Sequence, residues 1–156
     1  MKSKNWIILG GLVTFCLIIG MAFYFGQASP IFLRGKAIVA PELRGDLGKI
    51  STVFVIITDP KSDSPRPLAA YREVLRRPIK GDSYNFTLTP ENTQIMGDSS
   101  ANPDGFMGLP VVINVKIRFD QDGAAGPDSS GDLTGDAQNI VLGTKDLEIS
   151  VKQKTP

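Results

Sequence analysis

Residues 6–26 carry no charged side chain, and this stretch constrains the chain more than any other feature of its sequence. It reads WIILGGLVTFCLIIGMAFYFG, and a helix of that length spans about 31 Å, the thickness of the hydrocarbon core of a bilayer. Lys2 and Lys4 precede it and the next charge is Arg34, so the positive-inside bias predicts a cytoplasmic N-terminus. We therefore expect a cytoplasmic tail (1–5), a transmembrane anchor (6–26), a linker (27–33) and a domain outside the membrane.

Two alternatives to an anchor follow from the same residues. A cleaved signal peptide would end after Ala28, but the apolar region of such peptides is usually only about 7–15 residues long. A lipid-modified Cys16 is disfavoured, because the preceding residues VTF are not small and Cys16 lies in the middle of the segment. We expect Cys16 to be a small apolar side chain of the membrane helix.

Composition narrows the classes of function. The chain has 156 residues, no histidine and one cysteine. It therefore lacks the usual general base, the commonest metal ligand, any intramolecular disulfide and the Cys-x-x-Cys-His signature of haem attachment. A net charge of +1 argues against a nucleic-acid partner. These features favour a protein that acts by binding, without a cofactor, over an enzyme.

Short apolar runs rich in β-branched residues, separated by turn residues, fill the chain after the anchor. In the second half of residues 109–119 they alternate with polar residues, so that one face is predicted to hold Val111, Ile113, Val115, Ile117 and Phe119. The runs cover residues 36–40, 52–58, 84–89, 109–119, 139–143 and 145–153. This pattern predicts an all-β fold: an antiparallel, Greek-key-like β-sandwich over residues 34–152 with almost no helix, and a tail at 153–156.

Residues 67–78, PLAAYREVLRRP, fit this pattern least well. Leu68, Tyr71 and Leu75 have helical spacing, and Pro67 suits the first turn of a helix. The alternation expected of a strand is weaker and is interrupted by Glu73. Local propensity alone favours a helix here.

Four aspartates follow the alternating run of residues 109–119: Asp120, Asp122, Asp128 and Asp132. Carboxylates at short spacing could bind calcium, but the glycine and the twelfth position do not match an EF-hand loop. Asp122–Gly123 is instead a strong turn signal for a hairpin. We expect no metal site, and these residues are the only calcium candidates.

The next stretch, SSGDLTGDAQNIVLG from Ser129 to Gly143, has the glycines of a phosphate loop. It lacks a lysine and no helix follows it, so we expect a corner between two strands in which glycines supply the turn.

Basic residues gather in the ambiguous segment and on both sides of it, at Arg66, Arg72, Arg76, Arg77 and Lys80. Such a cluster could bind a carboxylate, an anionic lipid head group or an acidic protein, or could simply be a solvated face. Arg72, Arg76 and Arg77 are our candidates for partner binding.

The order of these motifs resembles the C-terminal β-domain of CcmI/CycH-type cytochrome c biogenesis proteins. That family has, in order, a Gly-containing strand, a Val-Phe-Val strand, Pro-Leu-Ala-Val-x-Arg, a Phe-x-Leu…Met segment, a strand with its hairpin, and Gly-Asp-Leu-x-Gly. The counterparts here are Gly35, Val53–Val55, Pro67–Arg72, Phe86–Met96, Val115–Ala124 and Gly131–Gly135. The resemblance covers about residues 34–152, and the tetratricopeptide repeats usual in the family are absent from this sequence.

The resemblance implies that residues 67–78 pair as a strand. It also implies a membrane-anchored, non-enzymatic assembly factor for c-type cytochromes in the bacterial inner membrane, with its domain in the periplasm, binding apocytochrome or the haem-ligation machinery. An accessory subunit of a membrane respiratory complex is the alternative. A hydrolase using carboxylates is disfavoured, because no acid pair lies in an apolar setting that would raise a pKa.

Overall fold

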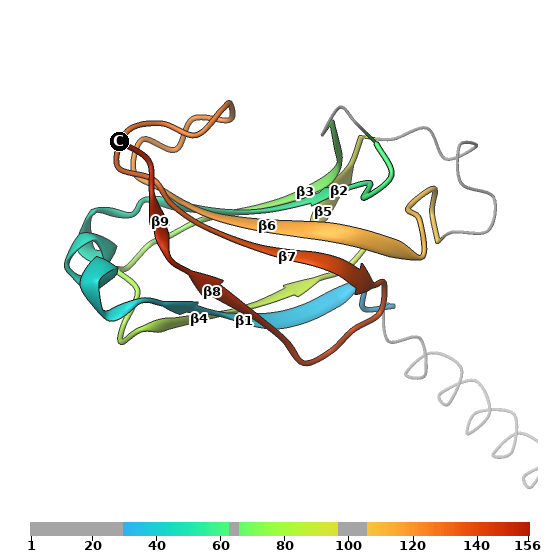
Figure 1. Ribbon diagram of the computed structural model, residues 1–156, viewed down its shortest axis with the longest axis horizontal. Coiled ribbons are helices and arrows are strands. Elements are labelled where there is room, and N and C mark those ends of the chain that lie inside the picture. The colour runs from blue at the N-terminus through green and yellow to red at the C-terminus, as the bar shows by residue number, and fades with distance from the viewer. Residues whose placement is uncertain (1–29, 63–65, 97–105) are drawn as a thin grey trace, which may run out of the picture. The chain divides into compact units, whose positions relative to one another are not determined.

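The protein is described from a computed structural model over residues 30–62, 66–96 and 106–156 (Figure 1). Residues 31–156 form one compact unit of mainly β structure, with two sheets and one short helix. The predicted anchor, residues 6–26, lies outside the described residues. Within those residues, no helix is long and apolar enough to cross a membrane.

The strands divide unequally between the sheets. The three-stranded sheet has the order β4-β1-β8, with β1 Leu33–Val39, β4 Ser83–Leu88 and β8 Leu147–Val151. The six-stranded sheet has the order β5-β3-β2-β6-β7-β9, with β2 Thr52–Thr58, β3 Pro67–Val74, β5 Thr93–Ile95, β6 Val112–Asp120, β7 Leu133–Val141 and β9 Gln153–Lys154. The sheets face each other as two layers (Figure 1). The mainly β, two-sheet prediction is therefore confirmed.

Alternating side chains of both sheets fill the space between the layers. On β6, Ile113, Val115 and Ile117 are buried, and on β1, Leu33, Ala37 and Val39 are buried. All six belong to one apolar cluster that includes residues of both sheets. Period-two patterning thus places one face of each strand in a shared core.

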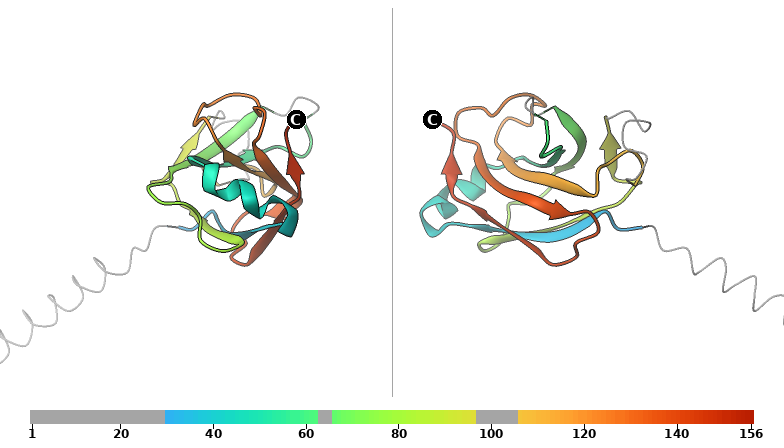
Figure 2. Two further views of the ribbon diagram at one scale, coloured as in Figure 1. Left: turned by 90° about the vertical axis from the view of Figure 1, so that its left-hand side faces the viewer. Right: turned by 45° about the vertical axis from the view of Figure 1, so that its right-hand side comes forward.

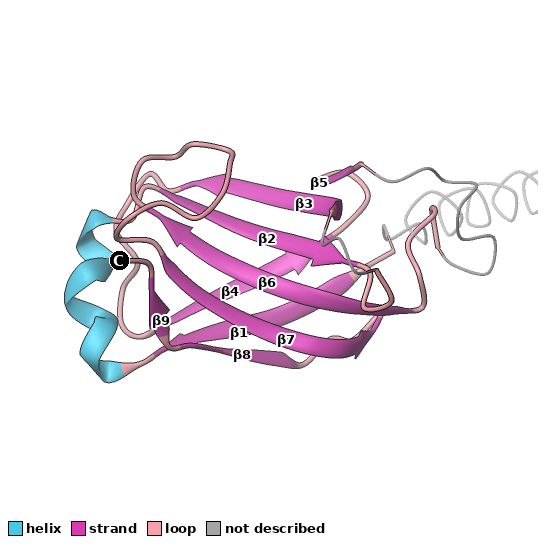
Figure 3. Cartoon of the chain, turned by 45° about the horizontal axis from the view of Figure 1, so that its top comes forward, coloured by secondary structure: helices cyan, strands magenta, loops and turns pink. Residues whose placement is uncertain are grey.

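A 3-10 helix that the sequence patterns do not predict, η1 (Pro41–Lys49), lies across one end of the two layers (Figures 2 and 3). Pro41 begins it, and Leu47 on its inner side is buried in the core. Asp46 ties the helix to β9 through Lys154, at 2.7 Å, and also pairs with Lys49 at 2.9 Å. These two cations lower the pKa of Asp46.

The ambiguous segment is a strand over its first eight residues, as expected from the resemblance. β3 pairs with β2 from Thr52↔Val74 to Thr58↔Pro67, and its other edge pairs with β5. Two-sided pairing and burial of Ala69 outweigh the local helical preference.

The expectation of a purely antiparallel fold is wrong at one place, because β1 and β8 run parallel, from Gly35↔Leu147 to Val39↔Val151. Only Lys152 separates β8 from β9, which belongs to the other sheet. The C-terminal segment therefore passes from one layer to the other, and its direction is set by both partners rather than by a hairpin.

Strands also extend past the predicted domain bounds at both ends. Leu33, placed in the linker, begins β1, and Gln153–Lys154, placed in the tail, pair with Thr134 and Leu133 of β7. A two-residue polar strand has no alternation by which the sequence could reveal it.

Gly135 of β7 allows the two layers to approach each other at this crossing. An ideal Cβ on Gly135 would lie 2.5 Å from the carbonyl oxygen of Ser150 in β8. The backbone of Lys152 also donates a hydrogen bond to Thr134 O, at 3.2 Å. Only glycine leaves room for this contact.

We expect Gly135→Ala to lower the free energy of unfolding by about 1–3 kcal/mol, because a methyl group would collide with backbone that cannot turn away. The matched control is Gly45→Ala in η1, where an added Cβ meets no atom within 4 Å. Urea unfolding of both variants tests this. Equal stabilities of the two variants would contradict the close approach.

Candidate functional site

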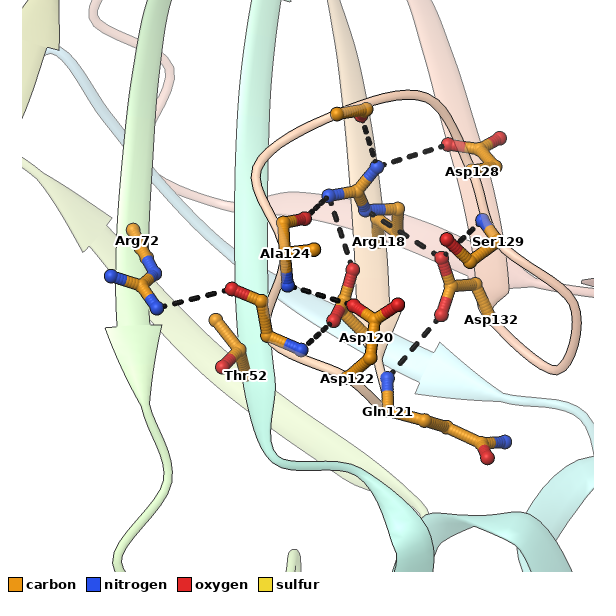
Figure 4. A network of polar contacts seen from close by, with 12 residues as sticks. Thr52, Arg72, Arg118, Asp120, Gln121, Asp122, Ala124, Asp128, Ser129 and Asp132 are labelled. Atoms are coloured by element: carbon orange, nitrogen blue, oxygen red, sulfur yellow. Dashed lines mark hydrogen bonds and ion pairs between the residues drawn. The ribbon is translucent and has the colours of Figure 1, made fainter.

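The connection between β6 and β7, residues 121–132, folds back over the outer face of the six-stranded sheet and covers Arg118 (Figure 4). Alternation along β6 directs Ile117 and Phe119 into the core and Arg118 to the outside. Arg118 is nevertheless only 1% exposed. A cation buried on an outward-facing position must be satisfied by the loop that covers it.

Two nitrogens of the Arg118 guanidinium donate hydrogen bonds to the loop, while its buried Nε forms none and faces the carboxylate of Asp132. The guanidinium donates to Gly126 O at 2.6 Å and to Ala124 O at 2.9 Å, and it lies 4.6 Å from the centre of the Phe54 ring. Three carboxylates surround it, at 3.1 Å (Asp120), 3.6 Å (Asp128) and 3.9 Å (Asp132).

Two of these carboxylates, together with that of Asp122, also accept hydrogen bonds from the backbone of the loop. Asp132 accepts hydrogen bonds from Ser129 N at 2.8 Å and from Gln121 N at 3.3 Å, and Asp120 accepts one from Gly123 N. Asp122 accepts from Ala124 N at 2.7 Å. The loop is therefore fixed by its own aspartates around one arginine.

This network uses the four calcium candidates in another way. Asp120, Asp128 and Asp132 are brought together, but around the positive charge of Arg118, while Asp122 bonds the loop backbone. Across residues 30–62, 66–96 and 106–156, no group of three or more acidic, histidine or cysteine side chains is arranged to hold a metal ion. Sequence reasoning missed Arg118, although its place on the outward face of β6, just before the aspartates, was the available signal.

The pKa values of two of these carboxyl groups are shifted in opposite directions, one by burial and one by a hydrogen bond. Burial raises the pKa of Asp120 above its ordinary value of 3.8, and the charge of Asp132 adds to this, against the lowering effects of Gly123 N–H and Arg118. The hydrogen bond from Ala124 N–H lowers the pKa of the exposed Asp122.

The stretch from Ser129 to Gly143 forms the end of this loop and then a strand. Gly131 has a φ of +93°, which glycine adopts readily, and Leu133, where β7 begins, is fully buried. The strand thus starts six residues before the predicted 139–143 run. The glycines of this stretch serve the turn and the close approach at Gly135.

The three candidate partner-binding arginines separate into two roles. Arg72 on β3 donates to Gly123 O at 3.1 Å and lies 5.8 Å from the Phe54 ring, so it holds the other side of the loop. Arg76 and Arg77 follow β3 and are exposed, and neither forms an ion pair or hydrogen bond with another described residue. Of the three candidates, only Arg76 and Arg77 have no polar partner in the part of the chain that the structure describes.

A second polar cluster joins the layers at the side opposite the crossing of β8 and β9. Glu73 of β3 accepts hydrogen bonds from Tyr71 OH, at 2.6 Å, and from Tyr84 OH of β4. Burial raises the pKa of both tyrosines, and Glu73 adds to this. Glu73, which interrupts the alternation of β3, therefore links the two sheets.

Comparison of the chain with protein-family models, curated proteins and solved structures returns no match.

Replacing Arg118 should destabilise the domain strongly. We expect Arg118→Met to cost about 3–5 kcal/mol in urea unfolding, because Asp120 and Asp132 would remain buried without their counter-charge. The control is Lys116→Met, which removes a partly exposed ion pair with Asp128 and should cost less than about 1 kcal/mol. Similar losses in the two variants would mean that the network contributes no more than a surface ion pair.

The opposite pKa shifts predict opposite pH dependences. Because the folded-state pKa of Asp120 is raised, its stabilising contribution is present below 3.8 and is lost as pH rises through the folded-state value. Wild type should therefore lose stability relative to Asp120→Asn as pH rises from about 3 to 7. Asp122 contributes above 3.8 instead, so the deficit of Asp122→Asn at neutral pH should vanish as pH falls through the lowered value. Urea unfolding of wild type and both variants across this range measures these differences. If the stability of wild type relative to each variant changed in the same direction with pH, the opposite pKa shifts would be contradicted.

Proposed function

We propose that the chain is a membrane-anchored, non-enzymatic β-sandwich protein that assists the maturation of c-type cytochromes by binding protein partners in the periplasm. The observation that carries the binding role is an open sheet edge on β4. The order of the sequence motifs supports the assignment to c-type cytochrome maturation.

Strand β4 has a single neighbour among the described strands, β1. Phe32 N donates to Leu88 O at 2.8 Å, so Leu88 and every second residue before it direct their backbone groups toward β1. Ser83, Asn85 and Thr87 direct theirs away from the sheet. Asn92 satisfies Thr87 O at 2.8 Å, which leaves the Ser83–Asn85 portion as the open edge.

The other sheet edges are less suited to receiving a strand. β8 lies beside β7 and continues into β9, and β5 has only three residues. A partner segment in extended conformation would therefore add to β4, where backbone hydrogen bonds supply affinity and side-chain pockets supply specificity.

A groove on the outer face of the three-stranded sheet lies next to this edge. It has a volume of about 400 Å³, and Asn85 and Thr87 of β4 line it together with the cations Arg34, Lys36 and Lys145 and the carboxylates Asp146 and Glu148. A lining of both charges beside an open edge suits a partner strand with polar and charged side chains. Arg76 and Arg77 add exposed positive charge that would steer such a partner at low salt.

The pathway is supported by the six ordered motifs that resemble cytochrome c biogenesis proteins. Gly35 lies on β1 and Gly135 on β7, and each leaves no room for a Cβ, at 2.6 Å from Leu147 O and 2.5 Å from Ser150 O. Asp132 of the Gly-Asp-Leu-x-Gly motif holds the loop over Arg118. The motif residues thus have architectural roles, which fits a domain that holds partners.

Deleting the gene should lower covalently attached haem in membrane and periplasmic fractions and leave b-type haem unchanged. The full chain should restore it, and a version without residues 1–29 should restore it poorly, because tethering raises the local concentration near membrane-bound machinery. Haem staining measures the covalently attached haem, and difference spectra measure c-type and b-type haem separately. Normal c-type haem, together with stoichiometric co-purification of the protein with a respiratory complex, would favour the accessory-subunit alternative.

The binding edge has its own test in Asn85→Pro. Proline removes an outward N–H from an edge strand without breaking a bond to β1, so folding should be retained while complementation falls at least about tenfold. Asn85→Thr, which keeps the backbone donor, is the matched control and should complement fully. Full complementation by the proline variant would exclude strand addition at β4.

A further inference from the structure

We propose that one end of the β domain docks on the surface of the lipid bilayer. The surface consists of exposed apolar side chains around the point where the chain enters the domain, and we call it the apolar end: Phe106, Met107, Val111, Val112 and Val141. The proposal rests on the anchoring part of the proposed function. It adds an orientation, with the apolar end against the lipid and η1 away from it.

The side chains of the apolar end are well exposed to solvent. Their exposed fractions are 43% (Phe106), 47% (Met107), 53% (Val111), 37% (Val112) and 55% (Val141). Single exposed apolar residues are common, but a contiguous group marks an interaction surface. The other two large exposed apolar residues of the described chain are Met96, just after β5, and Val74, at the far end of β3.

Strand pairing, hydrogen bonds and a ring contact place this group at one end of the domain. Val112 pairs with Val141 across β6 and β7, and Leu142 N donates to Val111 O at 2.8 Å. The ring of Phe106 packs on Phe32, with centres 5.4 Å apart. Gly143 N in turn donates to Phe32 O at 2.7 Å. The beginning of β6, the end of β7 and the beginning of β1 therefore meet at one end of the domain (Figures 1 and 3).

The length of the preceding chain points to lipid as the occupant. Four residues, 27–30, separate the uncharged segment 6–26 from Ile31, and even fully extended they reach at most about 14 Å. An anchor that spans the bilayer would thus hold Phe32 close to the head-group layer, which is several Å thick on each side. The whole stretch 27–33 is also uncharged. Phe, Met and Val beside this linker suit insertion at the boundary of head groups and acyl chains.

Site-specific fluorescence on the full chain tests the docking. In a Cys16→Ser background, single cysteines replace Val111, Val141 or the control Val74, which is 58% exposed at the opposite end of the domain. Each is labelled with bimane and reconstituted into phosphatidylcholine–phosphatidylglycerol vesicles containing a nitroxide quencher near the head group. Labels at 111 and 141 should show blue-shifted emission and quenching about threefold stronger than the label at 74.

The native fluorescence of Trp6, the only tryptophan, separates the two hypotheses because it reports on the predicted anchor. Lipid quenching of Trp6 without quenching of labels 111 and 141 would overturn docking and leave the anchor intact. Absence of lipid quenching at Trp6 would overturn the anchor itself. A signal at 111 that disappears when the protein is diluted into excess lipid would identify a second copy as the occupant and would overturn docking on lipid.

Discussion

The path of the loop between β6 and β7 depends on its contacts with the guanidinium of Arg118. Its carbonyl partners Ala124 and Gly126 belong to the loop that hides it from water, so the buried cation and the loop fold stabilise each other. Asp128 and Asp132 close the remaining sides. Without this centre, a polar twelve-residue connection would have little reason to lie flat on a sheet, because it buries few apolar side chains.

Burial of that centre also explains the raised pKa of Asp120. Asp120, the carboxylate nearest the guanidinium, and Asp132 are both buried, whereas Asp128 is partly exposed and pairs with Lys116. Burial, with the charge of Asp132 adding to it, raises the pKa of Asp120, which therefore binds a proton more readily than an aspartate in water. An arrangement that resembles a cation site in sequence thus has its cation supplied by the chain.

Sequence patterns predicted the features that depend on local alternation and missed those that depend on distant partners. Alternation located β6 and β8, and a continuous apolar run located β2, which is buried along most of its length. These patterns could not show that β8 would run parallel to β1, nor that η1 would close one end, since neither property changes the period of apolar residues. Arg118 was missed for a related reason: an outward position on a strand normally means exposure, and only the path of the following loop reverses this. The strand at β3 was predicted through the family resemblance rather than through its own propensity.

The parallel pairing of β1 with β8 joins residues near the beginning of the domain to residues near its end, from Gly35↔Leu147 to Val39↔Val151. Contacts between residues so far apart in sequence form late in folding, because closing a long loop costs conformational entropy before the contacts can offset it. Until the last strand arrives, β1 has a partner only on its β4 side, and Phe86 lies over a glycine in a sheet of two strands. For a chain that is synthesised from its N-terminus, β8 and β9 therefore complete both layers last, and the domain reaches its native form only after these two strands have been made.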